Sequence, residues 1–166
     1  MEIPPRKFSI GGLKLSLELI QIRLLPKAGM TVNEMLSRLT DNQINLFGVA
    51  LDAADGRLAG ICCLSAEDRT TAVWALQPFE GSYEILSPVG ALTIFPIQSR
   101  LALMSRLVSV LGTAGLPIYG MVSSPSSFTI TTDYERLDEA VSAVCQVVTL
   151  PDNHAPFRPE FHVRQL

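Results

Sequence analysis

The segment INLFGVA at residues 44–50 is matched further along the chain by LPIYGMV at residues 116–122. An aromatic residue followed by glycine stands at the same place in both. A second match follows each of them, AVWAL at residues 72–76 and AVSAV at residues 140–144. Because the two matches occur in the same order in both halves, the chain is predicted to hold two copies of one structural unit.

The first copy has the pattern of a βαββαβ unit. Thr31-Val32-Asn33-Glu34 has the spacing of a capping box, and Met35, Leu36 and Leu39 continue an apolar helical stripe. Alternating apolar residues indicate strands, with Asp55-Gly56 as a hairpin turn. Strands are expected over residues 17–25, 46–51, 58–64 and 83–86, and helices over residues 31–42 and 65–76, the second capped by Ser65.

The second copy repeats this order. Ser99 is a candidate N-cap, Gly115 suits a left-handed helix end, and Thr132–Glu135 has the spacing of a second capping box. Ser123-Ser124-Pro125-Ser126 is typical of a turn. Strands are expected over residues 91–95, 118–122, 128–131 and 147–150, and helices over residues 99–115 and 132–144.

The predicted fold is α+β, with two tandem ferredoxin-like units at residues 13–87 and 88–150. Each unit would place two helices on one face of a four-stranded antiparallel sheet. Apolar residues on both faces of the strand at residues 46–51 indicate packing between modules or dimerisation. Residues 151–166 form a proline-rich tail. Its FHVR segment at residues 161–164 would either add a strand to a sheet edge, in this chain or on a partner, or remain flexible.

The segment ELIQIRLLPKAGMTVNEMLSRLTDNQINLFGVA at residues 18–50 resembles the opening of an ACT domain, an amino-acid-binding module found beside many biosynthetic enzymes. Those domains run strand, Pro-Gly loop, helix and a short Gly-Ile-Asn turn. Residues 90–144 resemble the tandem ACT pair at the carboxyl end of aspartokinases. No kinase domain fits in the remaining residues, so the resemblance implies a free-standing ACT pair, similar in size to the separate regulatory subunit of some aspartokinases.

The resemblance also implies where a ligand would bind. In ACT modules the sites lie at interfaces between modules, at the loop after the first strand and the start of the second strand. The positions carried over to the first module are Lys27, Ala28, Gly29, Met30 and Asn45. Those in the second module are Ile97, Gln98, Ser99 and Pro117. The second module lacks the loop glycine and has proline where asparagine is expected, so its site is expected to be altered or lost.

The chemistry of the first of these positions supports ligand binding, with a structural alternative for each. A glycine before a helix lets the backbone approach a ligand, and free amides at a helix start favour a carboxylate. Asn45 offers both a donor and an acceptor. Alternatively, Gly29 only shapes the turn, Thr31 already satisfies the helix amides, and Asn45 only caps the strand entry.

Other functional classes find little support. The net charge of −3, with 13 Lys and Arg spread along the chain, argues against a nucleic-acid partner. No apolar run indicates a signal peptide or a membrane span, so a cytoplasmic location is expected. Cys62, Cys63 and Cys145 are expected to be core residues, and His154 and His162 lack a metal-ligand spacing. No catalytic set, metal or cofactor motif is present.

Three functional hypotheses follow. The first is a non-enzymatic regulatory protein that binds an amino acid and acts allosterically, as a homodimer or on a partner enzyme. The second is a structural or interaction module that kept the fold and lost the ligand. The third is a small enzyme on a ferredoxin-like fold, because a fold does not fix a function.

Overall fold

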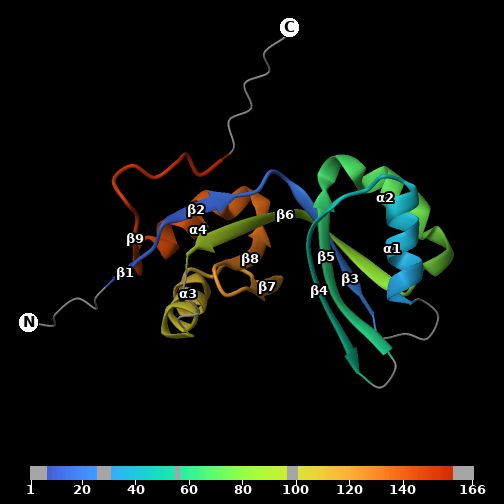
Figure 1. Cartoon of the computed structure of the whole chain (residues 1–166), viewed down its shortest axis with the longest axis horizontal. Coiled ribbons are helices and arrows are strands. Elements are labelled where there is room, and N and C mark those ends of the chain that lie inside the picture. Colours follow the sequence, from blue (N-terminus) through green and yellow to red (C-terminus); the bar gives the residue numbers. More distant parts are fainter. Residues whose placement is uncertain (1–6, 26–30, 55–56, 97–100, 159–166) are drawn as a thin grey trace, which may run out of the picture. The chain divides into compact units, whose positions relative to one another are not determined.

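The computed structural model describes residues 7–25, 31–54, 57–96 and 101–158. The chain divides into two compact units (Figure 1). One, the continuous unit, is Glu18–Val89, and the other, the split unit, combines Met1–Leu17 with Gly90–Leu166. Each unit is an antiparallel sheet with two helices, so the predicted α+β, ferredoxin-like fold is confirmed.

The continuous unit follows the predicted element order. Its elements are β3 (Leu19–Leu24), α1 (Val32–Asp41), β4 (Leu46–Ala54), β5 (Arg57–Ser65), η1 (Ala66–Asp68), α2 (Arg69–Leu76), η2 (Gln77–Phe79) and the first part of β6 (Tyr83–Phe95). The strands lie in the order β4-β5-β3-β6. The core between the sheet and its two helices is apolar and includes Ile20, Ile22, Met35, Leu39 and Leu76.

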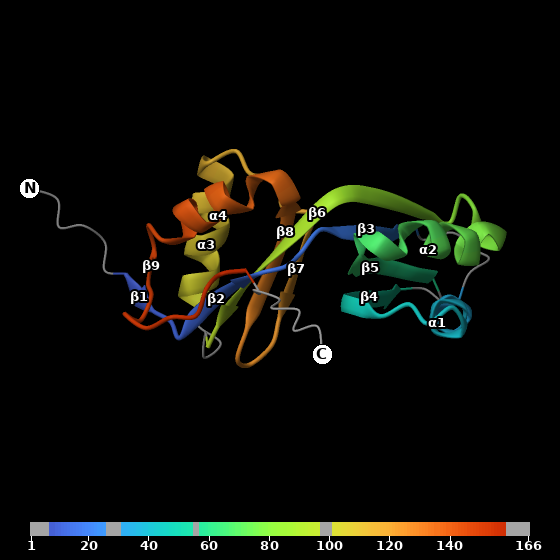
Figure 2. The same ribbon diagram turned by 90° about the horizontal axis from the view of Figure 1, so that it is seen from above.

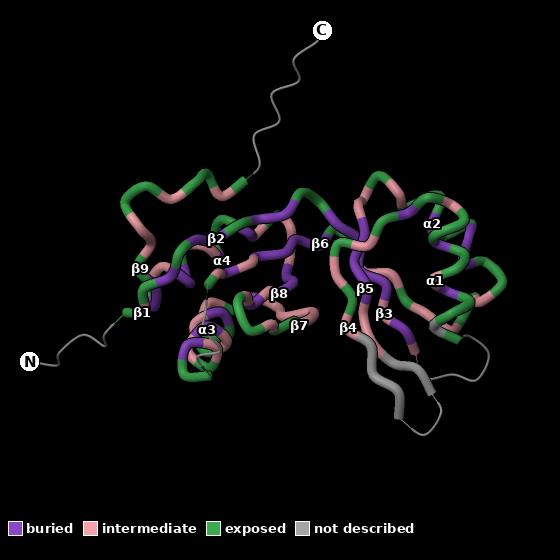
Figure 3. Tube along the Cα trace, viewed as in Figure 1, coloured by how far each residue is buried: buried purple, intermediate pink, exposed green. Residues whose placement is uncertain are grey.

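The split unit is built from both ends of the sequence. Its elements are β1 (Phe8–Ser9), β2 (Gly12–Leu15), the second part of β6, α3 (Leu101–Thr113), β7 (Gly120–Ser123), β8 (Phe128–Asp133), η3 (Tyr134–Arg136), α4 (Leu137–Val144) and β9 (Val148–Thr149). The order of its sheet is β2-β6-β8-β7. Figure 2 shows α3 and α4 on one side of this sheet, and Figure 3 shows buried positions along its strands and in both helices.

The fourth strand of the split unit is not the one predicted. β2 pairs with β6, from Gly12 opposite Phe95 to Leu15 opposite Leu92, and so takes the place expected for residues 147–150. Residues 148 and 149 do form a strand, β9, but it pairs in parallel with β1 outside the main sheet. The boundary predicted at residue 13 therefore differs from the observed division, because residues 13–17 belong with the second copy.

β6 is one strand of 13 residues, where two separate strands were expected. It changes partner along its length, pairing with β3 as far as Val89 and with β2 from Leu92 onward. The chain therefore passes between the two units twice, at Leu17–Glu18 and at Val89–Gly90.

The internal repeat is reproduced in atomic detail at the ends of α1 and α3. The amide of Ile44 donates to the Leu39 carbonyl at 2.9 Å, and the amide of the matching Leu116 donates to the Leu111 carbonyl at 3.0 Å. The preceding residues both have left-handed backbones, with φ of 59° at Gln43 and 66° at Gly115. Gly115 confirms the predicted cap. The buried residues of the second match also coincide, namely Ala72, Ala75 and Leu76 with Ala140, Ala143 and Val144.

Exchanging the residue types at these two helix ends should change stability in opposite directions. A side chain in the left-handed region costs about 1 kcal/mol, and glycine relieves it. Gln43→Gly is therefore expected to raise the free energy of unfolding by about 0.5–1 kcal/mol and Gly115→Gln to lower it by about 1 kcal/mol. Urea denaturation would measure both, and equal signs for the two changes would contradict the shared geometry.

The two predicted capping boxes differ in outcome. Thr31 and Glu34 form one as expected. The second, at Thr132–Glu135, is wrong because β8 continues through Asp133, and the Asp133 carboxylate accepts a hydrogen bond from Tyr119. Thr132 is buried, and its hydroxyl has no hydrogen-bond partner within the described residues. The predicted turn at Asp55-Gly56 and the predicted cap at Ser99 lie outside those residues.

Removing the Thr132 hydroxyl should stabilise the chain. Thr132→Val keeps the shape of the side chain and deletes a buried polar group, so the free energy of unfolding is expected to rise by about 1 kcal/mol. Thr129 provides the matched control, because its hydroxyl lies 2.8 Å from that of Thr93 and Thr129→Val should destabilise. A loss of stability in Thr132→Val would show that the hydroxyl is satisfied.

Candidate functional site

The start of α1 directly follows the loop positions predicted for the first-module site. The Thr31 hydroxyl oxygen accepts from the Glu34 amide at 3.2 Å, and a Glu34 carboxylate oxygen accepts from the Thr31 amide at 3.0 Å. The same carboxylate oxygen also accepts from the Thr31 hydroxyl at 2.8 Å. The backbone hydrogen bond from Thr31 is the largest cause that holds the pKa of Glu34 below its ordinary value. A carboxylate of this chain therefore already occupies the helix start.

This arrangement bears on the chemistry expected of a ligand. The amide of Glu34 is engaged by Thr31, which agrees with the structural alternative for the helix amides. A second negative charge close to Glu34 would be repelled, whereas an ammonium group would be attracted. The expectation that this helix start favours a ligand carboxylate is therefore weakened.

Of the predicted ligand-binding residues, Asn45 is the one that lies within the described ranges. It is exposed and directly precedes β4, in the position at which the second strand of the module begins. Pro117, the residue carried over to the same place in the second module, is half-buried and precedes β7. The loop residues Lys27, Ala28, Gly29, Met30, Ile97, Gln98 and Ser99 lie outside the described residues.

The capping interaction can be tested without a ligand. Thr31→Ala removes the hydroxyl acceptor and should lower the free energy of unfolding by about 1 kcal/mol. It should also let the pKa of Glu34 move back toward its ordinary value, so its stabilising effect would be lost at a higher pH on acidification. A carboxyl-detected NMR titration of Glu34 in both chains would measure this. An identical titration in the two would contradict the capping box.

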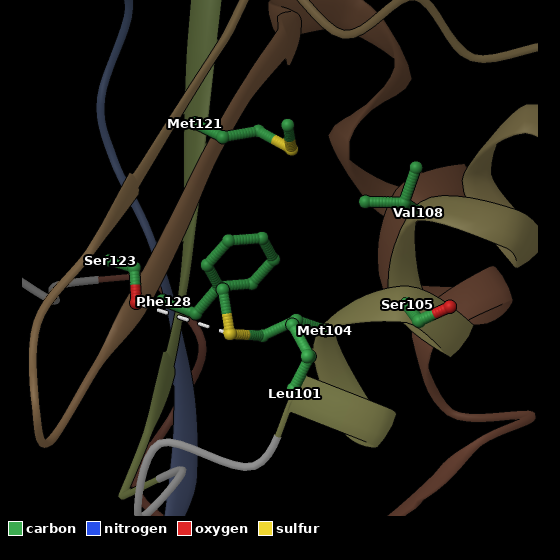
Figure 4. Close-up of a pocket in the computed structure, with 7 residues that line it drawn as sticks. All are labelled: Leu101, Met104, Ser105, Val108, Met121, Ser123 and Phe128. Carbon is green, nitrogen blue, oxygen red and sulfur yellow. Dashed lines mark hydrogen bonds between the residues drawn. The ribbon is translucent and has the colours of Figure 1, made fainter.

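A groove in the split unit was not anticipated from the sequence. It has a volume of about 460 Å³ and lies between α3 and the strands β7 and β8 (Figure 4). Apolar side chains dominate its walls, and two serines add hydroxyl groups. The lining residues are Leu101, Met104, Ser105, Val108, Met121, Ser123 and Phe128. None of these side chains carries a charge, so the groove suits an apolar occupant better than a zwitterion.

The groove could have been predicted in part. Positions 101, 104, 105 and 108 share one face of a helix, beside the buried stripe at Leu103, Leu107 and Leu111. An apolar surface wider than one stripe indicates a second contact. The missing information was the position of β7 relative to α3, which depends on tertiary packing.

Cys62 and Cys63 have the core role that was expected of them. Cys62 and Cys63 are both buried, and burial raises their pKa to about 12 and about 11, respectively. Cys62 packs in the helix-side core, while the Cys63 thiol contacts the Gln21 side-chain oxygen at 3.7 Å. Within the described ranges, no group of three or more His, Cys, Asp or Glu could hold a metal ion. No helix of the described chain has the length and apolarity to cross a membrane.

Comparisons with solved structures match this architecture. The regulatory subunit of aspartate kinase from Thermus thermophilus, in a ligand-free form, matches with a TM-score of 0.72 over 84% of this chain and 99% of its own, at 17% identity. The corresponding subunit from Thermus flavus gives 0.71 over 83% and 97%, also at 17% identity.

The chain has the fold of an aspartate kinase regulatory region. The larger aspartate kinase from Synechocystis contains a similar region, with a TM-score of 0.73 and 14% identity over 93% of this chain and 29% of that one. These matches confirm the ACT-pair architecture inferred from the sequence. No protein-family model and no curated protein sequence matches the chain.

Proposed function

We propose that the chain is a regulatory protein that binds an amino acid through its first ACT-like module and thereby acts on a partner enzyme. The observation that carries the proposal is its match to free-standing regulatory subunits over 97% or more of their length. The chain therefore corresponds in fold to these regulatory subunits over nearly their whole length. It has no catalytic activity of its own in this proposal and is located in the cytoplasm.

The ligand site of this proposal lies beside the start of α1 and the start of β4. Lys27, Ala28, Gly29, Met30 and Asn45 form its first-module part, and Gln98 and Ser99 remain the second-module candidates. The charged Glu34 carboxylate supports an orientation in which the ammonium group of the amino acid lies toward α1. The side-chain amide of Asn45 would then contact the carboxylate, because its NH₂ group can donate to it.

In the proposed mechanism, the ligand has different affinities for two arrangements of the modules. A ligand that binds one arrangement of modules more tightly shifts the population toward it, and a partner enzyme that contacts that arrangement responds. A binding difference of about 1.4 kcal/mol changes the ratio of the two states tenfold.

A thermal-shift screen of the proteinogenic amino acids tests the ligand. One of them should raise the unfolding temperature of the chain, because a ligand at 100 times its Kd stabilises by about 2.7 kcal/mol. Asn45→Ala should reduce that shift. Asn42→Ala is the matched control, since the Asn42 side chain donates to the Arg38 carbonyl at 2.8 Å and caps α1. The absence of any shift at millimolar concentrations would contradict amino-acid binding.

A second candidate function is an interaction module without a ligand. Phe47 and Val49 are exposed on β4, which is the last strand of its sheet in the described part of the chain. An apolar sheet edge of this kind is typical of a surface that pairs with another protein. This function predicts a stable homodimer or hetero-complex that forms equally well with and without amino acids, which purification from the native cell in both conditions would measure.

A further inference from the structure

The groove of the split unit lies beside a sheet edge. β7 is the last strand in the order β2-β6-β8-β7 within the described residues. Its Met121 and Ser123 side chains point into the groove, as Figure 4 shows, while Val122 between them has the opposite orientation expected of a strand. A further strand added outside β7 would therefore direct every second side chain into the space between β7 and α3.

The dimensions of the groove define how many side chains, and of which type, such a strand can insert. Its α3 wall runs from Leu101 to Val108, which spans about 10 Å along a helix. Alternate residues of a strand lie about 6.7 Å apart, so two side chains fit. Both must be apolar and uncharged, because the groove walls are Leu, Met, Val and Phe with two serines.

The carboxyl-terminal segment of this chain has the required pattern. PEFHVRQL at residues 159–166 places Phe161 and Val163 two positions apart, with His162 and Arg164 on the opposite parity. We infer that this segment adds a strand to β7 and inserts Phe161 and Val163 into the groove. The inference is independent of the proposed amino-acid site.

The position of the described end of the tail decides which copy of the chain provides the segment. The Ser16 amide donates to Ala91 of β6, so the amide of Leu15 points to the outer edge of β2. The Leu15 amide donates to the Phe157 carbonyl at 2.7 Å, which places Phe157 beyond that outer edge. A strand beyond β7 lies five strand spacings away, or about 24 Å.

This distance exceeds the reach of the chain. The four residue steps from Phe157 to Phe161 span at most about 14 Å when fully extended. The segment therefore binds the groove of a second copy. Two copies related by a twofold axis exchange their tails reciprocally and form two equivalent junctions.

Four variants of the full chain test the exchange of tails. In each strand, a residue whose side chain points into the groove is compared with a neighbour whose side chain points away from it. Phe161→Ser removes an inserted side chain, and Met121→Lys places a charge in the groove. Each is expected to weaken self-association at least tenfold. His162→Ser and Val122→Lys change the neighbours that point away from the groove, and each should alter the dissociation constant less than threefold. Sedimentation velocity across a concentration series measures the dissociation constants, and unfolding midpoints verify the fold of each variant.

Mixing the two defective chains provides the decisive measurement. Phe161→Ser keeps an intact groove and Met121→Lys keeps an intact tail, so an equal mixture can form one junction and should associate more tightly than either variant alone. The inference is overturned if the unmodified chain stays monomeric at all concentrations, if Phe161→Ser associates as the unmodified chain does, or if the mixture is no tighter than its components.

Discussion

A chain shortened to residues 16–166 is expected to lose the folded structure of the split unit. The missing residues include β2, which occupies the fourth strand position beside β6. Ile10, Leu13 and Leu15 are all buried in the core of this unit. Burial of each contributes about 1.5–3 kcal/mol, so their removal costs about 5–9 kcal/mol. A whole domain is stable by only about 5–15 kcal/mol.

Two-dimensional NMR of the shortened chain would show the effect unit by unit. Resonances from α3, β8 and α4 should lose their dispersion, whereas those from β3, α1 and β5 in the continuous unit should keep it. Removal of residues 159–166 from the other end is the control and should leave both units folded. If the shortened chain still folds its second copy, β2 is not needed as the fourth strand of the split unit. That result would support a module at residues 88–150.

Gly90→Ala is expected to destabilise the chain by about 1–3 kcal/mol, because the site has no room for a methyl group. A Cβ atom at position 90 would lie 2.6 Å from Cδ1 and 2.7 Å from Cγ of Leu137, which is itself fully buried in α4. The Leu137 side chain would have to move within a closely packed core, and such a shift costs free energy.

Gly48 of β4 provides a matched control for this change. A Cβ atom there would meet nothing within 4 Å, so Gly48→Ala should change the free energy of unfolding by less than about 0.5 kcal/mol. Urea denaturation of both variants measures the difference. Equal stabilities would show that α4 does not pack against β6 at Gly90.

Local signals in the sequence were sufficient for most elements of the fold. The Thr31–Glu34 box and the left-handed Gly115 depend on contacts within one helical turn, and both are present. The repeat also identified equivalent helix ends, although Gln43 gives no sign of the left-handed backbone it adopts. These features depend on neighbours in the sequence, so periodicity and spacing contain the necessary information.

The errors concern contacts between residues far apart in the sequence. GLKL at residues 12–15 is too short to indicate its partner, and its pairing with residues 92–95 depends on tertiary structure. Thr132 has a local capping pattern, but β8 continues through Asp133, and next to Thr132 the Tyr119 amide donates to the Thr131 carbonyl at 2.9 Å. Long-range strand pairing therefore overrides the local helix signal.

The candidate site was only partly accessible to sequence reasoning. The resemblance indicated loop positions and Asn45, and the exposed place of Asn45 before β4 agrees with that role. The charge of Glu34 at the helix start follows from the capping geometry and changes the expected ligand orientation. The groove beside β7 required the packing of α3 against the sheet.

An NMR titration of the full chain with the amino acid that gives the largest thermal shift tests the proposed function most directly. The account predicts saturable shifts centred on the Asn45 side-chain amide and on the backbone amides of Thr31 and Glu34, with much smaller changes along α3 and β7. Shifts confined to α3 and β7, or no shifts at millimolar ligand, would contradict amino-acid binding at the first module.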